Sequence, residues 1–285
     1  MENRELSALI ALLDDPDAEV YTQVCSRLLA YGTEIIPRLE NAWERTMDPS
    51  VQKRIEEVVH KIQYKSLQKD FRTWAESNSS NLLNGAYLVT RYQYPTFDVK
   101  AADEKIERIR RTIWLELSHH LSPLEQINIF NHIFYTVLEF TPKASSQNYF
   151  IHRTLENKCG NGLMLGLLYL IIGQDLDIPV YGVSLPGRFF LTYAREPLQA
   201  TDKDGALRGK LLFYINPLTR GTIYSRSELI MELKKVGERI EPSDLVPCDN
   251  KTIISLLLEN LIDIYRQDAL VSRMEEIRQL LRIIS

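Results

Sequence analysis

The sequence predicts an α+β fold that is mostly α, and three observations support this prediction. Apolar residues recur at helical spacing through residue 65 or so, again from Asn81 to about Glu139, and once more from residue 250 onward. Between the last two regions, three short segments are rich in β-branched and aromatic residues, which is typical of strands. The chain has 285 residues, 45% of them hydrophobic, so a sizeable core can be buried.

The N-terminal part, residues 1–70, is predicted to consist of helical repeats. Asp15-Pro16 and Asp48-Pro49 each place an acid before a proline, which is a common start of a helix. The two dipeptides lie 33 residues apart, a period typical of helical repeats, and Gly32 stands where a first helix would end. We interpret this part as a pair of HEAT-like hairpins. A plain helical bundle without repeat ancestry is the alternative.

The middle of the chain is predicted to hold helices followed by strands. The helices expected from apolar spacing and proline stops are 81–95, Ala101–His120, Pro123–Leu138 and Leu163–Gly173. The expected strands are IPVYGVSL (178–185), RFFLTYAR (188–195) and LLFYINP (211–217). The polar stretch 196–210, which contains Asp204-Gly205, predicts a hairpin loop between the last two strands.

The C-terminal part, residues 246–285, is predicted to be a helical hairpin. Its first half carries apolar residues at 253, 254, 257, 258, 261, 264 and 265, which form one helical face. The same pattern repeats in ALVSRMEEIRQLLRII, and Asp268 just before it is a suitable N-cap for the second helix. We expect this hairpin to dock on the core.

Composition excludes several classes of function. The formal net charge is −4 with acidic and basic residues mixed, so we expect no nucleic-acid partner and no membrane partner. The N-terminus lacks the features of a secretory signal, and the apolar stretches are too short to span a bilayer. Cys25, Cys159 and Cys248 are widely spaced and form neither a disulfide framework nor a metal site. We therefore expect a cytoplasmic protein without a cofactor or a bound metal.

One segment has the pattern of an active site. NKCGNGLMLGLLYL (157–170) places a cysteine and two glycines just before an apolar helix, and strands follow. Papain-like enzymes need three parts in this order. A thiolate lies at a helix N-terminus, a histidine on the neighbouring strand takes its proton, and an acid or amide on the next strand orients the histidine.

A family resemblance rests on several motifs in the same order. Gly160-Asn161-Gly162, the stretch 163–193 with its GVSLPGRFF segment, and INPLTRG (215–221) resemble the bacterial transglutaminase-like family of the SirB type. TRYQYPTFDV (90–99) looks like the upstream signature of that family, and LLLENLIDIYRQ (256–267) looks like its helical tail. The resemblance covers roughly residues 80–285. It implies a transglutaminase-like (papain-like) core over 80–245, and the HEAT-like start matches a common N-terminal addition.

The resemblance also implies that the reactive groups have been replaced. The position of the nucleophile is occupied by Gly162, that of the histidine by Arg188, and that of the acid by Asn216. Neither glycine nor arginine can act as a nucleophile or a base at neutral pH. We therefore predict a non-catalytic protein that binds a protein partner as a scaffold or binding module, chiefly through its helical repeats.

Two points stay open at the level of sequence. Cys159 could serve a cysteine peptidase or acyl transferase with a rearranged base, and His152 is its nearest histidine in sequence; a structural cysteine is the favoured interpretation. Arg188 beside a helix N-terminus could bind a carboxylate or phosphate together with Asn161, Gly162 and Asn216. The alternative is that Arg188 pairs with an acid inside the protein.

Overall fold

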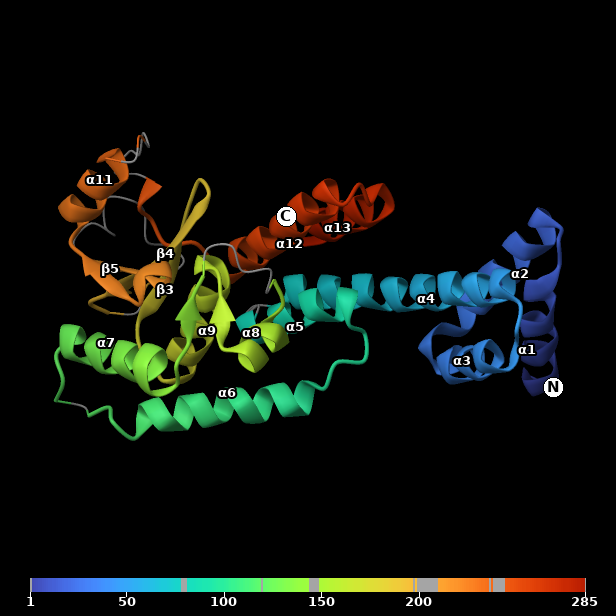
Figure 1. The fold of residues 1–285 in the computed structure, drawn as a ribbon, viewed down its shortest axis with the longest axis horizontal. Helices are drawn as coiled ribbons and strands as arrows, with labels where there is room; N and C mark the ends of the chain where they lie inside the picture. Colours follow the sequence, from blue (N-terminus) through green and yellow to red (C-terminus); the bar gives the residue numbers. More distant parts are fainter. Residues whose placement is uncertain are drawn as a thin grey trace. The chain divides into compact units, whose positions relative to one another are not determined.

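The computed structural model describes residues 2–77, 81–118, 120–143, 149–196, 198, 210–235, 237 and 244–284. Two compact units make up the chain, Met1–Thr73 and Trp74–Ser285. The predicted α+β fold is confirmed, with a helical N-terminal part, a small antiparallel sheet and a C-terminal helical pair (Figure 1). The predicted domain boundaries 1–70, 80–245 and 246–285 stay predictions.

The first unit is made of helices around a core of its own. Its helices are α1 (Glu2–Ala11), α2 (Ala18–Tyr31), α3 (Ile36–Arg45) and α4 (Pro49–Glu76), the last of which extends past the end of the unit. Leu13, Leu28 and Leu39 are completely buried and belong to one apolar cluster. The unit is helical as predicted, and the HEAT-like repeat ancestry stays a prediction.

Local sequence signals fix where these helices begin and end. The Asp48 carboxylate accepts the backbone N–H of Ser50 at 2.7 Å, so α4 begins at Pro49 as predicted. Gly32, at φ +71°, ends α2. The prediction that Asp15-Pro16 opens a helix is wrong, because Asp17 caps α2 and accepts the N–H of Glu19 at 2.7 Å.

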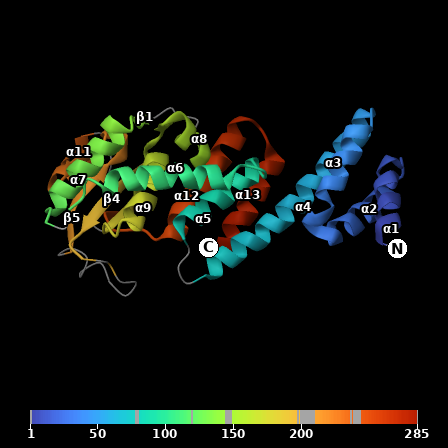
Figure 2. The same ribbon diagram turned by 90° about the horizontal axis from the view of Figure 1, so that it is seen from below.

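The second unit contains α9 (Gly162–Asp175), in which every residue from Leu163 to Gly173 is buried. The other helices are α5 (Leu82–Gln93), α6 (Val99–Trp114), α7 (Pro123–Asn131), α8 (Ile151–Asn157), α11 (Arg226–Lys235), α12 (Asn250–Gln267) and α13 (Val271–Ile284). α6 packs against α9 (Figure 2). The helix predicted over Pro123–Leu138 is divided, since a π-helical turn over His132–Val137 follows α7.

The sheet contains four antiparallel strands in the order β3-β4-β5-β6. They are β3 (Val180–Leu185), β4 (Arg188–Ala194), β5 (Leu211–Asn216) and β6 (Thr222–Tyr224), and the first three confirm the predicted strands. The predicted hairpin tip at Asp204-Gly205 lies outside the described residues. A short parallel pair, β1 (Thr141–Pro142) with β2 (Cys159–Gly160), was not expected from the sequence.

Helices cover both faces of this sheet. α9 packs on β3 and β4, where Phe189 lies against the helix at Gly166. The next residue, Phe190, belongs to a different cluster that includes Leu229 and Leu233 of α11. Because successive strand residues point to opposite faces, α9 and α11 lie on opposite sides of the sheet.

The C-terminal helices form a hairpin that docks on α5, as predicted. The Tyr265 hydroxyl of α12 donates to Gln93 Oε1 at 2.9 Å, and the Tyr92 hydroxyl donates to Glu276 Oε2 of α13 at 2.7 Å. Asp268 ends α12 and does not cap α13, which begins at Val271, so that part of the prediction is wrong. Among the described helices, none combines the length and the apolar character needed to cross a membrane.

Candidate functional site

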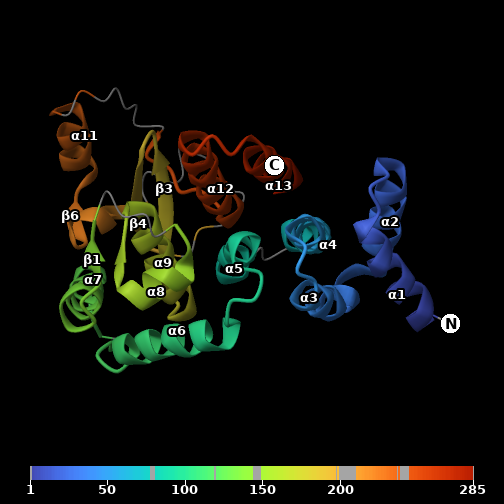
Figure 3. The same ribbon diagram turned by 45° about the vertical axis from the view of Figure 1, so that its right-hand side comes forward.

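A cleft of about 400 Å³ opens at the N-terminus of α9 and contains all three positions that the family resemblance singled out. Figure 3 shows three of the elements that contribute to it, α9, β4 and α12, and the ends of β3 and β5 contribute as well. Its lining residues are Asn161, Gly162, Leu163, Leu185, Gly187, Arg188, Phe189, Phe190, Asn216, Leu218, Leu256, Glu259, Asn260 and Asp263. The structure therefore brings Gly162, Arg188 and Asn216 together from segments far apart in sequence.

Gly162 is the first residue of α9. The side chain of Asn161 caps the helix, and its oxygen accepts the backbone N–H of Met164 at 2.9 Å. A Cβ built on Gly162 would lie 3.6 Å from the Leu218 Cβ and 3.8 Å from the Phe189 carbonyl oxygen. Both are ordinary contacts, so a side chain at this position would fit, and it would point toward the ends of β4 and β5.

Arg188 begins β4 directly after the turn at Gly187, and its side chain is exposed. The start of the strand is fixed by its neighbour, Phe189. A Cβ on Gly166 would lie 2.7 Å from the Phe189 ring, and one on Gly182 would lie 2.8 Å from it. Only glycine at both positions lets α9 and β3 enclose this ring, and the enclosed ring holds the first turn of α9 close to Arg188.

Asn216 ends β5 and lies at the opening of the cleft. Its side-chain oxygen accepts the backbone N–H of Leu218 at 2.9 Å, which caps a short 3₁₀ turn over Pro217–Thr219. The Tyr135 hydroxyl donates to the carbonyl of Pro217 at 3.1 Å and holds the same turn from the π-helical segment. Asn216 is thus fixed by local bonds that the sequence did not reveal.

α12 contributes acidic residues that the sequence analysis did not single out. Glu259 and Asp263 lie one helical turn apart and both line the cleft, as does Asn260 between them. The carboxylate of Asp263 also accepts from the Arg266 guanidinium at 2.7 Å, in an exposed ion pair. The signal was present in LLLENLIDIYRQ, but only the packing of the tail on the core shows which of its polar residues face the cleft.

Cys159 is not among the residues that line the cleft. It is half-buried in β2, where it pairs with Thr141. His152 lies on α8 and lines a different cavity of about 420 Å³, with its ring 4.6 Å from that of Tyr94. Burial lowers the pKa of His152, and its Nδ1 has no hydrogen-bond partner in the described part of the chain. The structure therefore places Cys159 outside the cleft lining and His152 in a different cavity.

The other two cysteines also lie outside the cleft. Cys25 is buried in the core of the first unit. Cys248 donates its thiol to the Gly182 carbonyl at 3.3 Å, and burial raises its pKa to about 11. Among the described residues, no three or more His, Cys, Asp or Glu side chains are grouped so that they could hold a metal ion.

The chain is similar in sequence to several known proteins. Residues 100–259 match a model described as the transglutaminase-like superfamily. The chain is 26% identical over 184 residues to the UPF0162 protein of Vibrio cholerae, and the match covers 62% of this chain and 63% of the relative. It is 24% identical over 193 residues to protein SirB1 of Salmonella typhimurium, covering 65% and 67%.

A UPF0162 protein of Xylella fastidiosa is similar as well, at 24% identity over 189 residues, with 65% of this chain and 64% of the relative covered. The match thus spans less than two thirds of the length of the two UPF0162 proteins. No solved structure matches the chain. The family match covers more than half of the residues and includes every residue of α9 and of the four-stranded sheet, so the chain belongs to the transglutaminase-like superfamily.

Proposed function

We propose that this protein is a non-catalytic member of the superfamily that works by binding a protein partner. One observation carries the proposal: a single cleft is lined by Gly162, Arg188 and Asn216, the residues that the family resemblance assigns to the positions of a Cys/His/acid triad. Glycine offers no nucleophilic atom, and a guanidinium stays protonated at neutral pH and takes up no proton. Asn216 could orient a base, but position 188 supplies none.

The helical first unit is the second part of the proposed binding module. Helical repeats present extended surfaces suited to protein segments. A cavity of about 790 Å³ in this unit is lined by residues of α1, α3 and α4, among them Ile10, Arg38 and Arg45. Trp43, 38% exposed, lines a second groove on α3 and α4. These hollows support a role as a scaffold, and three cysteines that form no disulfide in the described part of the chain support a reducing, cytoplasmic location.

The test is an acyl-transfer assay on four forms of the full chain. These are the wild type, Cys159→Ala, Gly162→Cys/Arg188→His, and the control Gly162→Ala/Arg188→His. Hydrolysis of p-nitrophenyl acetate and transfer of its acyl group to an added amine are measured. We expect the wild type and Cys159→Ala to react at the same background rate.

The restored thiol and imidazole of Gly162→Cys/Arg188→His should release about one equivalent of p-nitrophenol per chain in a burst, because a thiolate at a helix N-terminus is activated by an adjacent base. The alanine control has the same imidazole and no thiol at 162, so it should show no burst. Turnover by the wild type that Cys159→Ala abolishes would overturn the proposal in favour of a cysteine enzyme.

A further inference from the structure

We propose that the cleft recognises a peptide segment that carries both an acidic and a basic side chain, with the acid held by Arg188 and the base held by Glu259. This inference deepens the proposed function and rests on it, because it names the class of partner that the cleft would take. It replaces the simpler expectation that the cleft binds a carboxylate or phosphate alone.

Unlike charges enter this cavity from different elements. Arg188 is the first residue of β4, whereas Glu259 and Asp263 lie on one face of α12. A lone anion at Arg188 would be repelled by the Glu259 carboxylate, whereas the charge of Asp263 is offset by its ion pair with Arg266. A ligand that places a positive group near Glu259 turns the repulsion into attraction, so the cleft discriminates against simple anions.

Amide groups supply the remaining polar contacts. The side-chain oxygens of Asn161 and Asn216 are each held by a backbone N–H, of Met164 and of Leu218, at 2.9 Å. The NH₂ group of each amide is therefore fixed in orientation and can donate to a peptide carbonyl. Asn260 adds a third amide from α12.

The rest of the lining suits a short peptide. Leu185, Leu218 and Leu256 contribute apolar surface beside the polar groups. At about 400 Å³, the cavity lies in the usual range for ligand sites, which are mostly apolar with a few placed polar groups. Arg188, Glu259 and Asp263 are all exposed, so their charges lie at the mouth, where a segment of a partner protein can reach them.

The test uses N-acetylated, C-amidated peptides, whose ends are uncharged. One Asp and one Lys are separated by one, two or three glycines, in both orders. For each peptide, Asp is replaced by Asn and, separately, Lys by norleucine. Binding to the full chain is followed by NMR through the side-chain NH₂ signals of asparagine, with acetate and inorganic phosphate as further probes.

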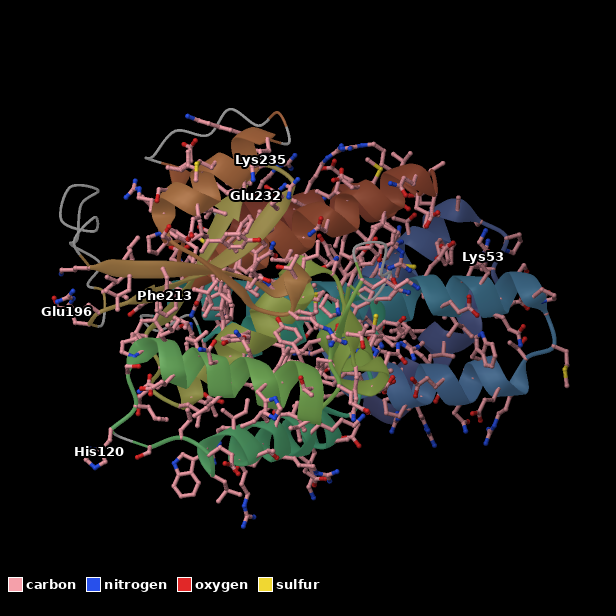
Figure 4. All side chains as sticks on the ribbon, turned by 60° about the vertical axis from the view of Figure 1, so that its left-hand side comes forward. Lys53, His120, Glu196, Phe213, Glu232 and Lys235 are labelled. Atoms are coloured by element: carbon pink, nitrogen blue, oxygen red, sulfur yellow. The ribbon has the colours of Figure 1, made fainter. Side chains whose placement is uncertain are left out.

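The variants are Arg188→Gln and Glu259→Gln. Matched controls come from an ion pair on α11, in which Lys235 Nζ lies 3.0 Å from Glu232 Oε2, outside the cleft lining (Figure 4). We expect Arg188→Gln to weaken binding of the best Asp/Lys peptide about fivefold, the upper range for an exposed pair, and to leave the Asn version unchanged. Glu259→Gln should weaken binding of the same Asp/Lys peptide by a similar factor and leave binding of the norleucine version unchanged. Lys235→Gln and Glu232→Gln should have no effect.

Two results would overturn the inference. One is that acetate or phosphate binds as tightly as the best peptide, which would make the cleft a simple anion site. The other is that no peptide of the series binds, or that binding is insensitive to Arg188→Gln and Glu259→Gln. Either result would leave the non-catalytic proposal standing, since that proposal is decided by the acyl-transfer assay.

Discussion

Glycines play two different parts near the cleft: Gly166 and Gly182 lie against the Phe189 ring, whereas Gly162 lines the cleft itself. At Gly166 and Gly182 a Cβ would overlap the Phe189 ring, so packing requires glycine there. At Gly162 a Cβ would meet only ordinary contacts, and neither packing nor backbone conformation requires glycine. The fold would therefore accept a side chain at Gly162, the position that the family resemblance assigns to the nucleophile.

Cys248 provides a prediction about pH at the scale of one residue. Burial raises the pKa of its thiol from an ordinary 9.0 to about 11, so the folded state keeps the proton that the unfolded state loses near pH 9. Its contribution to the free energy of unfolding is complete below pH 9 and is lost as the pH rises toward 11. The loss should reach about 2 kcal/mol by pH 11.

The measurement is the free energy of unfolding in urea between pH 8 and 11 for the wild type and for Cys248→Ala. Titration of tyrosines and lysines affects both proteins alike, so the difference between the two curves isolates the thiol. We expect the stability advantage of the wild type to shrink as the pH rises. Parallel curves would show that the thiol is not protected by burial.

At the scale of elements, the sequence predicted what local signals determine. Strand composition located β3, β4 and β5, and apolar spacing located α5, α9 and α12. Asp15 and Asp17 are both suitable N-caps by residue type, and the sequence prediction chose the wrong one, since Asp17 caps α2. The π-helical turn over His132–Val137 continues the same apolar pattern as α7, so spacing alone could not reveal the change of helix type.

The turn between β5 and β6 provides a prediction at this scale. Gly221 has φ +76°, and Asn131 Nδ2 donates to its carbonyl at 2.9 Å, while the Tyr169 hydroxyl donates to Asn131 Oδ1 at 3.2 Å. A Cβ on Gly221 would overlap the Asn131 amide. Gly221→Ala should therefore cost about 3 kcal/mol or more, from the left-handed backbone and the overlap together.

Gly187→Ala is the matched control, because Gly187 has φ +66° and nothing lies within 4 Å of a Cβ there. It should cost only about 1 kcal/mol, the backbone part alone. Urea unfolding of the two variants measures the difference. Equal losses would mean that Asn131 does not lock this turn.

At the scale of the whole molecule, the order of motifs in the sequence pointed to three residues of the cleft. The acidic residues of the cleft were found only from the packing of the folded chain. Gly162, Arg188 and Asn216 lie at ends of consecutive elements, where the resemblance could place them one by one. Glu259 and Asp263 lie on α12. The hairpin of α12 and α13 is held on α5 by the hydrogen bonds of Tyr265 with Gln93 and of Tyr92 with Glu276, whose partners lie far apart in the sequence. Such long-range contacts leave no local signal, so the charge of the cleft could not be read from the sequence.

Each compact unit has a core of its own, and this leads to a prediction about unfolding. Leu28 is fully buried in the cluster of the first unit, and Leu191 is fully buried in β4 of the second. Truncating a buried leucine to alanine costs about 2–5 kcal/mol. In calorimetry, Leu28→Ala should lower one transition by about 10 °C, and Leu191→Ala should lower the other by about 5 °C, because the smaller unit has the smaller entropy of unfolding. Each variant should leave the transition of the other unit in place, whereas a single shared transition that both variants lower would show that the two cores unfold together.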